Sequence, residues 1–128
     1  MDPEKLWYTE DHEWIGEVNS VYAVGITQHA QEALGDITFV ELPELEREVA
    51  AQEETAVVES VKAASDVYAP VSGRVVQVNS ELETRPELVN QDPYGKGWFY
   101  KLADVITDDL NELMSADEYR AYLAKLEE

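Results

Sequence analysis

The sequence predicts a mainly β fold, a small barrel or sandwich with short helices packed at its periphery. Short stretches rich in β-branched and aromatic residues recur from Leu6 to Leu102, and turn-forming residues separate them. After Leu102 the apolar residues take the spacing of a helix. The chain has 128 residues and no long linker, so we expect a single domain over residues 1–128.

The predicted strands follow one another through short turns. They cover residues 6–9, 14–18, 21–26, 36–42, 55–58, 67–71, 74–78 and 97–102, with a further short strand around Val49. Asn19-Ser20 supplies the turn between the second strand and the third. In the strand over 36–42, one face should carry Ile37, Phe39 and Glu41, and the other Thr38, Val40 and Leu42. Pro43 stops this strand, and the acidic segment 44–54 is predicted to be largely irregular.

Cap residues mark the predicted helices. Thr27 is a suitable N-cap for a helix over 28–34, which Gly35 ends. The segment 82–94 is predicted to be a loop with one helical turn at 86–89. A C-terminal helical segment is predicted over about residues 108–126, with a capping box at Ser115-Ala116-Asp117-Glu118. Its apolar residues are Leu110, Leu113, Tyr119, Tyr122, Leu123 and Leu126.

Charge limits the classes of partner. The formal net charge is -19, with 28 acidic and 9 basic side chains. This disfavours nucleic acid and anionic membranes, because both require cationic groups on the protein. It favours partners with basic surfaces, whose association weakens with salt.

Composition also limits chemistry and location. There are no cysteines, so disulfides, thiolate metal sites and cysteine nucleophiles are excluded, and any thiol chemistry needs an attached cofactor. The sequence contains no run of about 18 apolar residues, so no membrane helix is predicted. The N-terminus, which begins Met1-Asp2-Pro3, has neither a secretory signal nor an Arg-rich transit peptide. We therefore expect a cytoplasmic, monomeric protein of bacterial type, or a mitochondrial-matrix protein if it is a processed eukaryotic form.

One lysine is the leading candidate for a functional site. Lys62 lies between the predicted strands 55–58 and 67–71, among small and turn-forming residues, so it should occupy an exposed hairpin tip. A free lysine amine has a pKa of about 10.4 and is a poor nucleophile at neutral pH unless it is buried. Lys62 is therefore better suited to covalent attachment of a group through an amide than to Schiff-base catalysis.

The sequence gives little support for a metal site, a phosphate-binding loop or a serine nucleophile. His12 and His29 are the two histidines, and their neighbours do not make a metal-binding spacing. There is no Gly-rich phosphate loop and no serine in a nucleophile elbow. Trp14, Trp98 and Tyr100 are expected in the core.

The lysine and its surroundings resemble the lipoylation signature of the glycine cleavage system H-protein family. The signature residues are Glu59, Ser60, Val61, Lys62 and Ala63, within a matching run over 59–73. Further matching segments lie at residues 8–14, 24–31, 34–36, 40–44, 86–90 and 92–98. The resemblance extends from about Leu6 to Leu123.

The resemblance implies a barrel-sandwich hybrid fold, like that of lipoyl and biotinyl carriers, with lipoic acid attached covalently to Lys62 by a lipoyl ligase or transferase. It implies a carrier that is not itself a catalyst. Glycine decarboxylase (the P protein) would load an aminomethyl group onto the arm, and aminomethyltransferase (the T protein) would pass its carbon to tetrahydrofolate. Dihydrolipoyl dehydrogenase (the L protein) would reoxidise the dithiol.

In the family the loaded arm folds into a surface cleft, and Glu13 and Asp66 match positions near it. Their carboxylates could pair with a cationic amine in a partly exposed site. The chain also departs from the family pattern. Glu46 and Gln52 replace two turn glycines, so the segment 44–54 is expected to be rebuilt, and Arg74 stands where an acidic residue is common.

Four alternatives stay open. An H-like carrier that relays lipoyl groups in another pathway would have the same signature. A lipoyl domain of a 2-oxoacid dehydrogenase complex usually has Asp-Lys-Ala at its tip, and a biotin carrier has methionines beside its lysine, where this chain has Val61 and Ala63. An enzyme is the remaining alternative, and glycine decarboxylation by the chain alone would reveal it.

Overall fold

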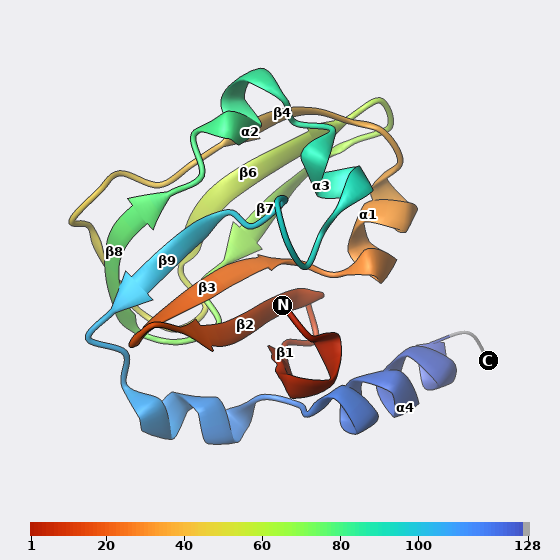
Figure 1. Ribbon diagram of the computed structural model, residues 1–128. Coiled ribbons are helices and arrows are strands. Elements are labelled where there is room, and N and C mark those ends of the chain that lie inside the picture. Colours follow the sequence, from red (N-terminus) through yellow and green to blue (C-terminus); the bar gives the residue numbers. More distant parts are fainter. Residues whose placement is uncertain (127–128) are drawn as a thin grey trace.

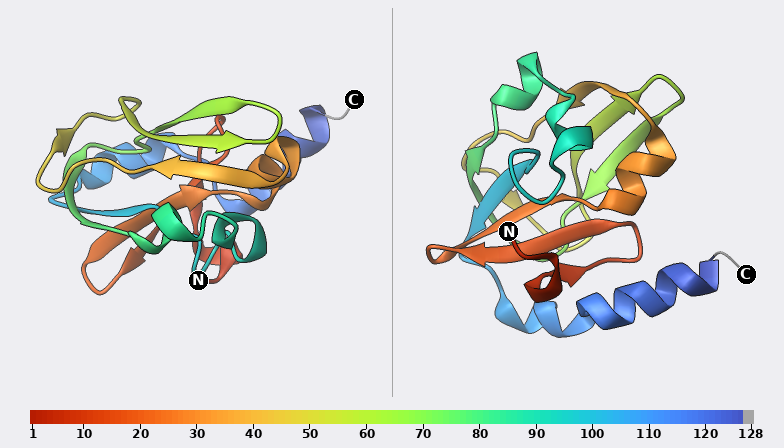
Figure 2. Two further views of the ribbon diagram at one scale, coloured as in Figure 1. Left: turned by 90° about the horizontal axis from the view of Figure 1, so that it is seen from above. Right: turned by 45° about the vertical axis from the view of Figure 1, so that its right-hand side comes forward.

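The computed structural model describes residues 1–126 as two antiparallel sheets with short helices, which confirms the predicted mainly β fold. Residues 127–128, the end of the predicted domain, lie outside the described part. One sheet has the strand order β1-β2-β3-β9-β8-β5 and the other the order β4-β6-β7. Figure 2 shows β4, β6 and β7 in one layer, with β3 and β9 in the layer beneath it.

The strands confirm most of the predicted boundaries to within a few residues. They are β1 (Trp7–Tyr8), β2 (Glu13–Val18), β3 (Val21–Ile26), β4 (Ile37–Glu41), β5 (Glu48–Val49), β6 (Glu54–Ser60), β7 (Ala64–Tyr68), β8 (Gly73–Val78) and β9 (Tyr100–Ala103). The α-helices are α1 (Gln28–Leu34), α2 (Glu81–Thr84), α3 (Leu88–Gln91) and α4 (Ala116–Leu126). Two 3-10 helices are η1 (Pro3–Lys5) and η2 (Thr107–Glu112). Figure 1 shows η2 and α4 crossing the lower side of the molecule, beside β1 and β2.

The two sheets enclose a core of aliphatic and aromatic side chains, and a buried series of hydrogen bonds joins β9 to β6 and β7. The Tyr100 hydroxyl of β9 donates to Thr55 Oγ1 of β6 at 2.9 Å, and the Thr55 hydroxyl donates to the Val67 carbonyl of β7 at 2.9 Å. Burial raises the pKa of the Tyr100 hydroxyl, which stays protonated and able to donate. An unpaired buried hydroxyl would cost free energy. These hydrogen bonds therefore favour one relative position of the two sheets.

The C-terminal helix α4 packs against β1 through a second apolar cluster. The rings of Tyr8 and Tyr119 stack with their centroids 4.5 Å apart. The predicted capping box is confirmed: the Ser115 amide donates to Glu118 Oε1 at 2.9 Å, and the Glu118 amide donates to Ser115 Oγ at 3.2 Å. Leu126, predicted on the apolar face, is 51% exposed, so the packed part of α4 ends before it.

The predicted alternation in β4 is wrong. Ile37 pairs with Ser60 and Phe39 with Glu59, so two steps along β4 match one step along β6. Thr38 is the extra residue of this β-bulge, and the bulge moves every following side chain to the other face. Ile37 and Val40 are therefore both buried, whereas Phe39 is 47% exposed.

Three further predictions are corrected. Residues 107–112 form a 3-10 helix where an α-helix was predicted, although Leu110 is buried as expected. Residues 82–84, which were predicted to be loop, belong to α2, and Leu82 of this helix is buried in the core. Trp98 is only half-buried, and the Lys101 ammonium lies 4.8 Å from its ring centroid.

Glu46 and Gln52 both have left-handed backbone, although neither is a glycine. Glu46 has φ 71° and Gln52 has φ 72°. The Gln52 amide donates to the Ala69 carbonyl at 2.7 Å, and the Glu46 amide donates to the Val75 carbonyl at 2.7 Å. Backbone hydrogen bonds hold both residues in a conformation that costs a non-glycine residue free energy.

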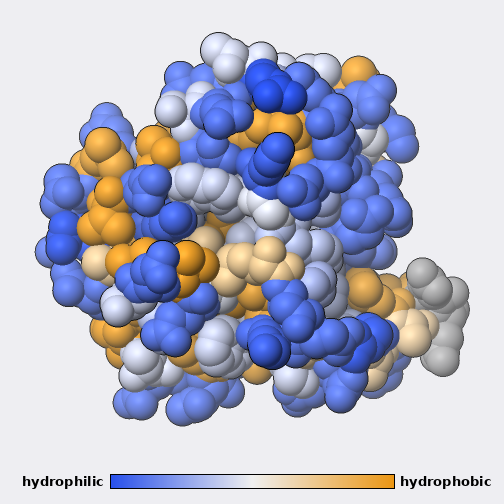
Figure 3. All heavy atoms as spheres, in the orientation of Figure 1, coloured by the Kyte–Doolittle hydropathy of each residue, from blue (hydrophilic) through white to orange (hydrophobic). Residues whose placement is uncertain are grey.

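Hydrophilic side chains cover most of the face seen in Figure 3, as a net charge of -19 requires. Among residues 1–126, the helices are all too short or too polar to cross a membrane.

Candidate functional site

Lys62 lies at the tip of the hairpin formed by β6 and β7, as predicted. Glu59 and Ala64 form the last paired position, which leaves residues 60–63 as the turn. The Lys62 side chain is exposed. In Figure 1 this tip lies at the upper right, at the end of the molecule that also holds α1.

Ser60 orders the backbone of the tip. Its amide donates to the Ala63 carbonyl at 2.8 Å, which closes the turn. Its Oγ accepts hydrogen bonds from the amides of Lys62 and Ala63, each at 3.1 Å. The Val61 amide donates to the Asp36 carbonyl at 3.1 Å and ties the turn to the start of β4. Lys62 is thus presented on a fixed backbone, with a free side chain.

Gly35 lies directly beside the lysine side chain, a contact that the sequence reasoning missed. Gly35 ends α1 with φ 81° and ψ -155°, a region that only glycine visits readily. A Cβ atom at this position would lie 3.5 Å from Lys62 Cε. The hydrogen bond between Val61 and Asp36 brings this glycine next to the tip, and the contact could not be read from local sequence alone.

Glu13 is buried, which corrects the expectation of a partly exposed carboxylate. It is 2% exposed. The Thr9 hydroxyl donates to Glu13 Oε1 at 2.6 Å, and the Tyr68 amide donates to Glu13 Oε2 at 3.2 Å. Burial raises the pKa of Glu13 to about 7, and the hydrogen bonds from Thr9 and Tyr68 oppose this rise. The carboxyl group therefore titrates near neutral pH.

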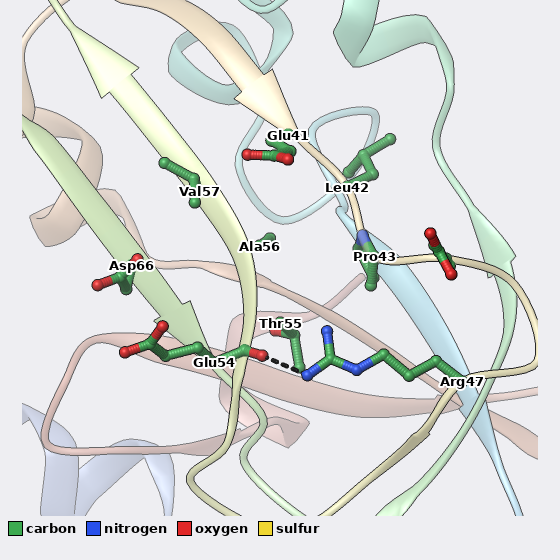
Figure 4. Close-up of a pocket in the computed structure, with 10 residues that line it drawn as sticks. Glu41, Leu42, Pro43, Arg47, Glu54, Thr55, Ala56, Val57 and Asp66 are labelled. Atoms are coloured by element: carbon green, nitrogen blue, oxygen red, sulfur yellow. Dashed lines mark hydrogen bonds between the residues drawn. The ribbon is translucent and has the colours of Figure 1, made fainter.

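Asp66 lies two residues before Tyr68 on β7, but its side chain is exposed. It lines a surface hollow of about 470 Å³ whose lining, within the described residues, does not include Glu13. Figure 4 shows Asp66 and Glu41 at this hollow, with Val57 between them. Both acids are therefore associated with β7. Asp66 belongs to this strand and faces solvent, whereas Glu13 is buried and accepts a hydrogen bond from its Tyr68 amide.

The two histidines lie together at the N-terminal end of α1, which contains His29. Their ring centroids are 4.5 Å apart, and His12 Nδ1 lies 2.8 Å from the Tyr119 hydroxyl of α4. Burial lowers the pKa of His12, and the neighbouring His29 lowers it further. Among residues 1–126, groups of three or more side chains suited to hold a metal ion were not found.

The comparison with known proteins places this geometry in a family. The family model described as glycine cleavage H-protein matches residues 6–126. The glycine cleavage system H protein of Psychrobacter sp. (strain PRwf-1) is 55% identical over 122 residues, which cover 94% of this chain and 97% of that protein. The chain belongs to the glycine cleavage H-protein family.

Other members of the H-protein family agree over similar lengths. The glycine cleavage system H protein of Neisseria meningitidis (strain Z2491) is 54% identical over 118 residues, covering 91% of this chain and 92% of that protein. The crystal structure of a glycine cleavage system H protein from Mycobacterium marinum superposes with a TM-score of 0.85 at 40% sequence identity. It covers 96% of this chain and 99% of that one, so the H-protein fold extends over nearly the whole molecule.

Proposed function

We propose that this chain is the lipoyl carrier of a glycine cleavage system, with Lys62 as the residue that carries the lipoyl group. The observation that supports the proposal most strongly is the hairpin tip, where the exposed Lys62 stands on a backbone ordered by Ser60. An exposed tip on a rigid scaffold suits a residue that several enzymes must reach in turn.

The residues at the tip fit a lipoyl amide. The Lys62 side chain is exposed, so a modifying enzyme can enclose it without unfolding the hairpin. Gly35 has no side chain to compete for the space beside the lysine. When bound, the lipoyl dithiolane supplies two sulfurs that can be reduced, loaded and reoxidised, which a chain with no cysteine cannot supply itself. The chain's own part is to present and release the arm.

The partners that we propose are the P, T and L proteins and a lipoyl ligase or transferase. The net charge of -19 favours association with basic surfaces and raises the rate of encounter at low salt. The apparent KM of the P and T proteins for this carrier should therefore rise with ionic strength.

We also propose that Glu13 and Asp66 stabilise the cationic amine of a loaded arm. Asp66 is exposed and can approach a cation directly. The Glu13 carboxylate is held by Thr9 and Tyr68, so it would act from within the protein, beside the edge of β7. Because its pKa is about 7, a nearby cation would favour its ionised form.

Reconstitution tests the proposal. The purified chain, lipoylated in vitro, is added to P, T and L proteins with glycine and tetrahydrofolate. We expect glycine decarboxylation that depends on the lipoylated chain and is absent with the unmodified chain. Efficient lipoylation without glycine cleavage would overturn the proposal and would favour a carrier that relays lipoyl groups in another pathway. Decarboxylation by the chain alone would show that it is an enzyme.

A further inference from the structure

The side chain of Asn90 makes three hydrogen bonds to the segment that leads from α1 into β4. Its Nδ2 donates to Gln31 Oε1 at 2.8 Å and to the Gly35 carbonyl at 2.9 Å. Its Oδ1 accepts from the Ile37 amide at 2.9 Å. Both donors and the acceptor of the side-chain amide are therefore engaged, each with a different residue. The partners lie at least 53 residues away in the chain, so these contacts depend on the tertiary fold.

Asn90 stands on α3, a short helix that is anchored in the core. The two residues before it, Leu88 and Val89, are buried. The Asn90 backbone amide donates to the Glu87 carbonyl at 3.1 Å. Figures 1 and 2 both show α3 beside α1, the helix that lies at the same end of the molecule as the hairpin tip. Asn90 can therefore fix the segment after α1 relative to the core.

A single peptide group connects Asn90 to the hairpin tip. The Asp36 carbonyl and the Ile37 amide belong to the same planar trans peptide, so they point in opposite directions. Asn90 holds the Ile37 amide on one side of this peptide. On the other side, the Asp36 carbonyl accepts from the Val61 amide at 3.1 Å. A displacement of this rigid group would therefore move Val61, the residue before Lys62.

Two further contacts connect the same segment to the tip. Ile37 pairs with Ser60, whose hydroxyl orders the turn. Gly35, whose carbonyl Asn90 holds, lies beside the lysine side chain, because a Cβ atom there would be 3.5 Å from Lys62 Cε. Glycine has the greatest backbone freedom of any residue. The position of Gly35 is therefore set by its hydrogen bonds, and Asn90 supplies one of them.

We propose that Asn90 is a positioning residue for Lys62. It fixes the peptide between Asp36 and Ile37, and it thereby holds the hairpin tip in the position in which Lys62 is lipoylated. This inference rests on the proposed function and adds a residue outside the lipoylation signature on which the modification depends.

The chemistry of the modification explains why a fixed tip matters. A lipoate ligase supplies lipoyl adenylate from lipoic acid and ATP. The neutral Lys62 amine attacks its carbonyl carbon, the amide C–N bond forms, the C–O bond to AMP breaks, and the amine proton passes to solvent. The Lys62 side chain is exposed and already free to rotate. Motion of the backbone would add to the freedom that the ligase must restrict, and small errors in the position of reacting atoms slow such reactions strongly.

The test compares two variants of Asn90 with a control that loses a buried hydrogen bond elsewhere. Asn90→Leu has a similar shape and removes all three hydrogen bonds. Asn90→Asp keeps an acceptor for the Ile37 amide but loses both donors. The control is Tyr100→Phe, which removes the hydrogen bond to Thr55, near the end of β6 that is far from the tip. None of these residues belongs to the lipoylation signature.

Three measurements are made on each protein. Denaturant unfolding gives the global stability, so that variants of similar stability are compared. Hydrogen exchange of the Val61 amide, followed by NMR in the unlipoylated chain, reports the hold on the tip without any ligase. Intact mass during incubation with a lipoate ligase, ATP and lipoic acid gives kcat/KM for lipoylation.

Asn90→Leu should lower kcat/KM for lipoylation about tenfold and speed exchange of the Val61 amide about fivefold. Asn90→Asp should show smaller changes in the same directions, because one of the three hydrogen bonds remains. Tyr100→Phe should stay within about twofold of the natural sequence in both measurements, because distant sites seldom couple.

Lipoylation of both Asn90 variants at the rate of Tyr100→Phe would overturn the proposal, even if Val61 exchanged faster, and would leave Asn90 a role in stability alone. If Asn90→Leu does not fold, the comparison of Asn90→Asp with Tyr100→Phe decides in the same way. Failure of the ligase to modify the natural sequence at Lys62 would instead overturn the proposed function, while Val61 exchange would still test the hold of Asn90 on the tip.

Discussion

Arg74 Nη1 of β8 lies 2.7 Å from Glu46 Oε2, in the turn that precedes β5. Arg74 Nε also lies 3.1 Å from Asp104 Oδ2. Hydrogen bonds from the guanidinium to Asp104 and Glu46 raise the pKa of Arg74. Arg74 therefore links the turn at Glu46 to Asp104, the residue that follows β9.

Gln52→Gly should stabilise the fold. Gln52 holds φ 72°, a conformation that costs a non-glycine residue roughly 1 kcal/mol or more, and glycine recovers part of this after its own entropy cost. We expect a gain of about 0.5–1 kcal/mol in the free energy of unfolding, measured with urea. Ala51→Gly is the control, since Ala51 is not among the left-handed residues and should lose stability. A loss of stability in both variants would contradict this account of the turn.

In a Glu13→Gln background, His12→Asn should flatten the dependence of stability on pH. The pKa of His12 is lowered by burial and by His29, so the unfolded chain binds more protons just below the ordinary histidine pKa of about 6.5. Stability should therefore fall as the pH drops through that range, and the contact of His12 with Tyr119 of α4 should weaken. Asn accepts the left-handed backbone of this position, φ 69°.

The measurement for His12 is the free energy of unfolding between about pH 5 and pH 7 in both proteins. Because Glu13 titrates in the same range with the opposite sign, the comparison is made in a Glu13→Gln background. An unchanged pH slope on replacing His12 would show that this histidine does not couple α4 to pH.

Glu13→Gln should stabilise the chain above neutral pH. Burial raises the folded pKa of Glu13 from 4.5 to about 7, so the folded state binds more protons between these values and loses stability as the pH rises through them. Gln can accept from the Tyr68 amide and donate to Thr9 Oγ1, which leaves no charge to bury. The gain should reach up to about 3 kcal/mol at alkaline pH and vanish near pH 4. Denaturant unfolding at about pH 4 and pH 8.5 measures it, and an equal effect at both values would contradict the raised pKa.

Glu13→Gln with Asp66→Asn should speed the non-enzymatic loss of the one-carbon unit from the loaded arm. A pairing of the amine with these acids is expected to contribute on the order of 1 kcal/mol, or a rate change of about fivefold. The decay of purified, loaded protein is followed with and without the substitutions, and the single variants separate the buried acid from the exposed one. Equal decay rates would assign any protection of the arm to apolar burial.

Local patterns were sufficient for the strands, the caps and the position of Lys62. β-Branched stretches between turn residues predicted the hairpin, and local hydrogen bonds made by Ser60 close its tip. The bulge at Thr38 could not be predicted, because it depends on how β4 pairs with β6.

Contacts between distant segments explain the remaining differences. A glutamate side chain is expected to be exposed because it is charged. Glu13 is nevertheless buried, because β2 packs beside Tyr68 of β7. The contact of Gly35 with Lys62 and the ion pair of Glu46 with Arg74 join segments that are far apart in the chain. Such pairs require the tertiary fold.

The intact mass of the chain before and after incubation with a lipoate ligase, ATP and lipoic acid tests the central claim most directly. The natural sequence should gain the mass of one lipoyl group. Lys62→Arg keeps the charge at the exposed tip but cannot form the amide, so it should fold normally and gain nothing. Lys96→Arg is a matched control at another exposed lysine and should be modified fully. A lipoyl group on the Lys62→Arg variant would contradict the assignment of Lys62.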